Sequence, residues 1–163
     1  MTIELLAGMM SAMLTVSPQA MPDPCTLISA AEIASALGGK PAPGIKEGPT
    51  RDEESKADSS SCMFGIGDRV LVVGLSEVGS DQAAAAALKE AQEVSKDADV
   101  GIPLNPQSGV GDQALWGITE GGATWVTRKG KYVLTLVVGG EEGDPSRLRG
   151  PLKRLIVSAL SKL

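Results

Sequence analysis

Cys25 and Cys62 are the only two cysteines of this chain, and they define the first chemistry to consider. Cys25 lies just after a signal-like N-terminus, and Cys62 opens an expected strand. The pair therefore indicates a disulfide, and a disulfide indicates an exported protein. The chain has no histidine, which removes the commonest general base and the commonest transition-metal ligand. We expect no metal and no cofactor.

Two other patterns could carry chemistry, but their context does not suit it. Residues 109–114 match G-x-G-x-x-A, a variant of the dinucleotide fingerprint. That motif works between a buried strand and a helix, whereas here an irregular segment precedes it and a strand-like pair, Leu115-Trp116, follows. The paired carboxylates Glu141-Glu142 lie in an expected turn, where nothing indicates the desolvation that tunes a catalytic acid. An enzyme would rely on carboxylates or serines that only the fold brings together.

The composition is that of one globular domain with an aliphatic core. Of 163 residues, 42% are hydrophobic, 21% are charged and 2% are aromatic. The net charge of −5 argues against a nucleic-acid partner, because phosphates need a basic surface, and against general adhesion to anionic lipid. We expect a monomer with a single domain over residues 21–163.

Residues 1–20 form a separate, signal-like segment. The run from Ile3 to Val16 is mostly apolar and too short to span a bilayer, and Ala20 suits a cleavage point. However, no Lys or Arg precedes the run, and Glu4 occupies a place where a signal peptide carries positive charge. Two alternatives therefore stay open: a cleaved export signal, which the apolar run favours, and a retained N-terminal segment. We expect no transmembrane span.

Helices are indicated at three places. The run Ser29–Glu32 is a capping box that begins a first helix. Ser80 caps a second helix over 81–96, where five successive alanines give high helix propensity. Residues 151–163 repeat apolar side chains at i, i+3, i+4 and i+7, which predicts an amphipathic helix docked on the core. The start of this helix has a basic face, expected to be solvated, formed by Arg147, Arg149, Lys153 and Arg154.

Five strands are expected between these helices. A hairpin pairs Phe64 with Leu71 across a two-residue turn. A three-stranded meander follows over 110–118, 123–128 and 131–138. The segment 40–61, which is rich in proline, serine and mixed charges, is expected to be a mobile loop.

The meander gathers three of the four aromatic residues on one face. The first turn places Trp116 opposite Trp125, and the second places Trp125 opposite Leu134 and Thr127 opposite Tyr132. This common face depends on register, because a one-residue slip would scatter the rings. Two interpretations stay open. Trp116, Trp125 and Tyr132 either fill the core beneath a helix or line the mouth of a ligand-binding groove, for which they are the candidate residues.

Three phrases of the sequence, PCTLISAAEI (24–33), SCMF (61–64) and VGDQALW (110–116), carry a family resemblance. With them, the chain resembles a broad group of small exported bacterial proteins of unknown function, among them actinobacterial lipoproteins. The resemblance implies an α+β domain with an antiparallel sheet, a Cys25–Cys62 bridge and an envelope location. It carries no agreed active site, so no catalytic residue transfers, and the anchoring cysteine of the lipoprotein members is missing. More distantly, the chain resembles the extracellular sensor domains of bacterial Ser/Thr kinases.

The expected fold is α+β: an antiparallel sheet of about five strands in the order helix, hairpin, helix, meander, helix, with one disulfide. The expected function is non-catalytic binding of a small ligand or a partner protein in the bacterial cell envelope. The alternatives are a carboxylate- or Ser-dependent envelope hydrolase or transferase and a structural envelope component. A pocket lined by the aromatic residues would favour ligand binding. A cleft with two carboxylates of raised pKa would favour an enzyme, and a flat apolar patch would favour a protein partner.

Overall fold

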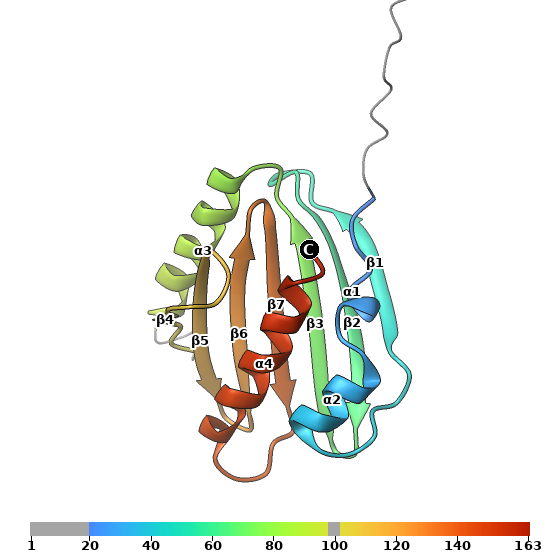
Figure 1. Cartoon of the computed structure of the whole chain (residues 1–163). Coiled ribbons are helices and arrows are strands. Elements are labelled where there is room, and N and C mark those ends of the chain that lie inside the picture. The colour runs from blue at the N-terminus through green and yellow to red at the C-terminus, as the bar shows by residue number, and fades with distance from the viewer. Residues whose placement is uncertain (1–19, 98–101) are drawn as a thin grey trace, which may run out of the picture.

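The computed structural model describes residues 20–97 and 102–163, so the signal-like segment lies outside the described residues except for Ala20. The described chain forms one seven-stranded sheet with helices on both faces (Figure 1). Neighbouring strands are antiparallel, in the order β1-β2-β3-β7-β6-β5-β4. The strands are β1 (Ile45–Arg51), β2 (Asp58–Ile66), β3 (Arg69–Glu77), β4 (Asn105–Gln107), β5 (Gln113–Thr119), β6 (Gly122–Lys129) and β7 (Tyr132–Gly139).

The prediction of about five strands is wrong, because it missed both edge strands. β1 lies inside the segment 40–61 that was expected to be a loop, and every one of its residues is exposed, so no alternation of buried side chains marks it. β4 has three residues, one of them Pro106. Proline and charge protect edge strands from unwanted pairing, and the same residues give a sequence the composition of a loop. The mobility of residues 40–61 stays a prediction.

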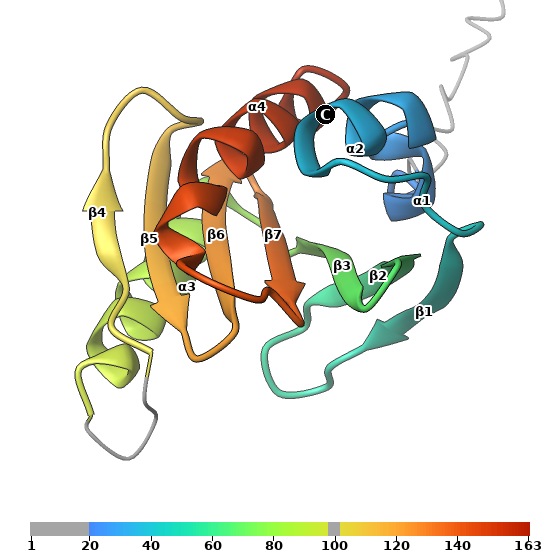
Figure 2. The same ribbon diagram turned by 90° about the horizontal axis from the view of Figure 1, so that it is seen from below.

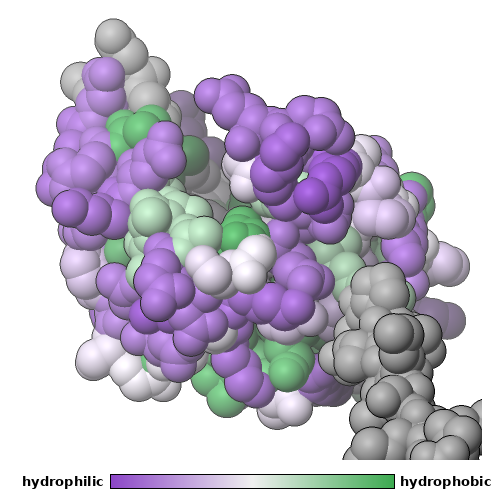
Figure 3. All heavy atoms as spheres, turned by 90° about the horizontal axis from the view of Figure 1, so that it is seen from above, coloured by the Kyte–Doolittle hydropathy of each residue, from purple (hydrophilic) through white to green (hydrophobic). Residues whose placement is uncertain are grey.

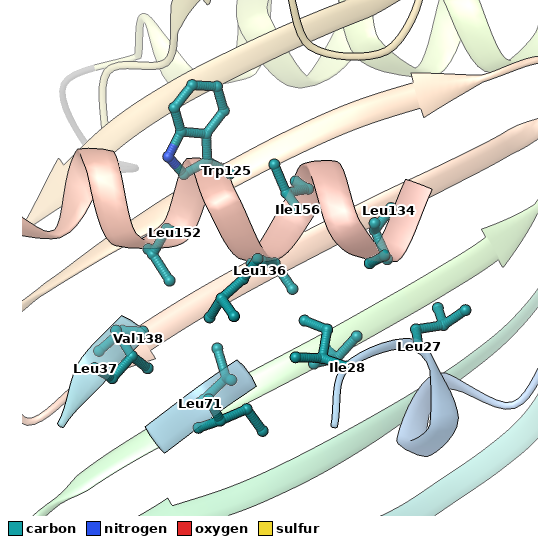
Figure 4. Close-up of a cluster of buried hydrophobic side chains, with 14 of the residues drawn as sticks. Leu27, Ile28, Leu37, Leu71, Trp125, Leu134, Leu136, Val138, Leu152 and Ile156 are labelled. Atoms are coloured by element: carbon teal, nitrogen blue, oxygen red, sulfur yellow. The ribbon is translucent and has the colours of Figure 1, made fainter. Parts of the chain in front are cut away.

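The helices cover the two faces of the sheet unequally (Figure 2). On one face lie α1 (Pro24–Leu27), α2 (Ala30–Leu37) and α4 (Arg149–Leu160), which follows a 3-10 turn, η1 (Pro145–Leu148). On the other face, α3 (Asp81–Ser95) packs against β5, β6 and β7. The main core lies under the first three helices, where Leu152 and Ile156 of α4 pack with Leu134 and Leu136 of β7 (Figure 4).

Two of the three predicted strand registers are confirmed, and one is shifted. Phe64 pairs with Leu71 across the β2–β3 turn, and Trp116 pairs with Trp125 across the β5–β6 turn. In the β6–β7 hairpin, however, Trp125 pairs with Leu136 rather than Leu134. The turn residues are Gly130 and Lys131, one position later than expected, which moves the pairing by two residues. A shift of two keeps every side chain on its predicted face.

The disulfide between Cys25 and Cys62 is present, which confirms the pairing. It joins α1 to β2, and the two Cα atoms lie 5.0 Å apart. Cys62 is fully buried in the core, while Cys25 is half-buried at its edge. The bridge therefore fixes the N-terminal helices onto the face of the sheet that also carries α4.

The capping box of α2 is formed as predicted and is connected to α4. Glu32 accepts from the Ser29 amide at 2.7 Å, and the Ser29 hydroxyl accepts from the Glu32 amide at 3.2 Å. The Ser158 hydroxyl of α4 donates to the same carboxylate, and Lys162 lies 3.4 Å from it. These hydrogen bonds, the one from Ser158 first, lower the pKa of Glu32 from 4.5 to about 2.

This carboxylate makes stability depend on pH. Because its pKa is lowered in the folded state, the stabilisation is present above pH 4.5 and is lost as the pH falls toward 2. Glu32→Gln keeps an acceptor for the cap but removes the charge. Because the side chain is 34% exposed and screened by solvent, we expect a loss of about 1 kcal/mol at neutral pH. Urea unfolding across pH should show the difference vanishing near pH 2; a constant difference would contradict this assignment.

Candidate functional site

The three candidate aromatic residues lie on the closed face of the sheet, the one that carries α4. The ring centroids of Trp116 and Trp125 are 5.4 Å apart, and the two residues are 6% and 1% exposed. Tyr132 packs half-buried against the same core. The structure thus brings the three onto one face, where the two indoles fill the core beneath the helices. The hollows described below are lined by other residues, and a ligand-binding role for these aromatics stays an untested prediction.

The opposite face of the sheet is half open. α3 packs against β5, β6 and β7, whereas β1, β2 and β3 extend beyond it (Figure 2). Seen along the strands, hydrophobic residues lie at the bottom of a hollow between hydrophilic lobes (Figure 3). Directly paired residues share a face, so an apolar row crosses this open half, formed by Ile45, Met63, Val72 and Val137. Ile45 is 65% exposed, and Met63 and Val137 are 39% and 38% exposed.

Beside this apolar row lies an open hollow of about 290 Å³. Its centre is the next pairing row, Glu47–Ser61–Gly74–Thr135, which crosses β1, β2, β3 and β7. A Cβ added to Gly74 would lie 3.7 Å from the Cβ of Thr135, an ordinary contact. The missing side chain of Gly74 therefore leaves the hollow open. A glycine inside a strand weakens it and often marks a place where a ligand approaches closely.

Hydroxyl groups and a bulge of β1 form the rim of the hollow. The Ser59 and Ser76 hydroxyls are hydrogen-bonded at 2.8 Å, and the Thr50 hydroxyl donates to the Ser59 carbonyl at 3.4 Å. The β1–β2 register shifts between Glu47 and Thr50, at Gly48. Gly48 has a φ of 85°, and a Cβ there would lie 2.8 Å from the Ser59 carbonyl oxygen. Glycine thus lets β1 approach β2 closely and keeps Glu47 at the rim.

Glu47 is the one charged side chain among the residues that line this hollow. Across residues 20–97 and 102–163, no basic side chain forms an ion pair with it. A carboxylate accepts hydrogen bonds, and hydroxyls both donate and accept them. The lining therefore suits a small polar ligand that carries hydroxyl or amino groups.

Five described carboxyl groups have a displaced pKa. Every carboxyl group whose pKa is displaced has it lowered, by hydrogen bonds from neighbouring backbone or side-chain donors; these are Asp23, Glu32, Asp52, Glu93 and Asp144. A catalytic acid at neutral pH needs the opposite displacement. The part of the chain that the structure describes also holds no cluster of three or more metal-ligating side chains.

The sequence did contain a signal for this hollow. Gly74 interrupts the apolar run of β3, and an interior glycine in a strand pattern indicates close approach of another group. The serines of 59–61 were assigned to a loop, so their pairing with β3 could not be foreseen. Because β1 was not predicted, nothing in the sequence placed the rim residues of β1 beside those of β2 and β3.

The architecture defines an α+β domain with one closed and one half-open sheet face. Among solved structures, it is similar in fold to the extracellular domain of PknH from Mycobacterium tuberculosis. The TM-score is 0.55 at 8% sequence identity, over 84% of this chain and 94% of that chain. At this identity the likeness concerns the fold alone, and it agrees with the distant resemblance to kinase sensor domains. No family model matches the sequence, and no curated protein matches it significantly.

None of the helices within the described ranges is long and apolar enough to cross a membrane.

Proposed function

We propose that the protein is an exported, non-catalytic binding domain, and that the hollow at Gly74 binds a small polar ligand. Export is supported by the Cys25–Cys62 bridge, which uses both cysteines of the chain, because disulfides persist in oxidising compartments. The fold shared with an extracellular domain is compatible with the same location.

The proposal rests on one observation: along one pairing row of the sheet, large apolar residues give way to small and polar ones. Where α3 covers the row, its residues are Val126 and Leu115. Where the row is open, it continues through Thr135, Gly74 and Ser61 to Glu47. A merely solvated strand surface favours larger β-formers at such positions, whereas small residues around a glycine leave space for a ligand.

A protein partner is the second candidate function, and the apolar row beside the hollow favours it. Ile45, Met63 and Val137 are exposed side by side with Val72 at the centre of the row. A contiguous apolar patch on a surface is typical of an interaction site. If this row is the functional surface, Ile45→Ser should abolish binding while filling the hollow should have no effect.

Filling the hollow tests the ligand proposal. Gly74→Val adds a β-branched side chain whose Cβ meets only ordinary contacts, so the fold should persist. We use glucosamine and glucose as probes, because both carry hydroxyls but only glucosamine carries an ammonium group. Glu47 should favour glucosamine by roughly three- to fivefold, as a surface charge pair does. Gly74→Val should weaken both probes at least about tenfold.

The matched control is Gly65→Val, in the neighbouring strand and outside the hollow, where a Cβ would lie 3.9 Å from its nearest neighbour. Glu47→Gln should remove the preference for glucosamine without changing glucose. NMR titration measures each dissociation constant. If Gly74→Val and Gly65→Val bind the two sugars with equal affinity, the proposed site is contradicted.

A further inference from the structure

We infer that the outer groove between α2 and α4 docks an acidic segment of a partner protein. A hollow of about 400 Å³ lies between the two helices, over Ala31, Ala36 and Leu155. Glu32 also lines it, and its carboxylate is paired with Lys162 at 3.4 Å. It adjoins a second hollow of about 390 Å³ along α4, and Arg154 and Ser158 line both. Figures 1 and 2 show α2 and α4 side by side on the closed face, far from the open half of the sheet. This surface is therefore separate from the hollow at Gly74.

The C-terminal segment that contributes α4 to this surface has a charge opposite to that of the molecule. Residues 145–163 contain five of the fifteen basic residues and none of the twenty acidic ones, so the rest of the chain holds ten basic and twenty acidic residues. Lys153 and Arg154 are both exposed on the outer side of α4. Neither forms an ion pair within the described part of the chain.

Among the described residues, these two cations form no ion pair that would stabilise the helix. The first turn of α4 contains no acid that could neutralise them. The sequence predicts a solvated basic face. Its unpaired charges instead indicate complementarity to an anionic partner.

The floor of the groove determines which anionic partner fits. Val157, which lines the second hollow along α4, is 46% exposed and one turn from Arg154. In the groove itself, the alanines of α2 leave room for an inserted side chain. An acidic peptide can place carboxylates on Lys153 and Arg154 and an apolar side chain over Val157. A bilayer surface is flat, and the net charge of −5 opposes adhesion to anionic lipid. The partner that fits this surface is therefore a protein segment.

The test uses a short fluorescein-labelled peptide of Glu and Leu in amphipathic order, with fluorescence anisotropy as the readout. Lys153→Glu with Arg154→Glu should weaken binding at least about tenfold, mostly through a slower association rate, and added salt should reduce the difference. The matched control, Lys89→Glu with Lys96→Glu, makes the same charge change at two exposed positions, one in α3 and one at its C-cap, and should leave binding unchanged. Val157→Ser should weaken binding about threefold with an unchanged salt dependence.

Thermal unfolding accompanies each titration. Because neither cation forms an ion pair among the described residues, reversing them should leave the melting temperature unchanged, which separates a docking role from a structural one. Vesicles of phosphatidylglycerol form the second arm. Vesicle binding without peptide binding, equal peptide binding by the two double variants, or no binding to either probe would each overturn the proposal.

Discussion

Removing the Cys25–Cys62 bridge should lower the free energy of unfolding by about 4 kcal/mol. The two cysteines are separated by 37 positions, and the closed loop contains α2, β1 and the start of β2. Without the bridge, the unfolded chain gains the freedom of this whole loop, while the folded state loses few contacts. Urea unfolding of Cys25→Ala with Cys62→Ala, compared with the oxidised protein, measures the effect.

Two controls separate the bridge from the packing of its sulfur atoms. Reducing agent should bring the wild-type protein to the stability of the double variant and should leave the double variant unchanged. The m-value should rise when the bridge is lost, because the unfolded chain exposes more surface. A stability difference below about 1 kcal/mol would mean that the bridge does not anchor the N-terminal helices.

Trp125→Ala should cost roughly 3–5 kcal/mol, because it removes the largest fully buried side chain and leaves a cavity under α4. Its indole N–H donates to no protein atom among the described residues, so Trp125→Phe should cost much less. The exposed Ile45 provides a control, and Ile45→Ala should change stability by less than about 0.5 kcal/mol.

The same variants decide between the two interpretations of the aromatic face. If Trp125 belongs to the core, Trp125→Phe leaves the affinity of the Gly74 hollow unchanged. A loss of binding at full stability would return the aromatics to the role of ligand-binding residues. Chemical unfolding followed by tryptophan fluorescence measures stability for Trp125→Phe, since Trp116 remains as the reporter.

Local signals in the sequence were enough for the interior of the fold. The capping box at Ser29, the hairpin pairing Phe64 with Leu71 and the pairing of Trp116 with Trp125 were all predicted, because each depends on residues close in sequence. The edge strands were not. β1 and β4 are defined by long-range partners, and their own residues are exposed, charged or proline.

The candidate site was harder to foresee for a related reason. Register places residues on one of two faces but does not say which face a distant helix covers. α4, at the end of the chain, covers the aromatic face, and α3 leaves half of the other face open. Glu47 and Gly74 meet only because β1 adds to the sheet, so the hollow appears only in three dimensions.

If the hollow at Gly74 holds a small ligand, that ligand should accompany the protein from its native source. Native mass spectrometry of the protein purified from the bacterium that produces it tests this most directly, with Gly74→Val and Gly65→Val prepared in the same way. We predict an added small-molecule mass on the wild-type protein and on Gly65→Val, and its loss from Gly74→Val. The same added mass on all three proteins, or none on any of them, would contradict ligand binding in the hollow at Gly74.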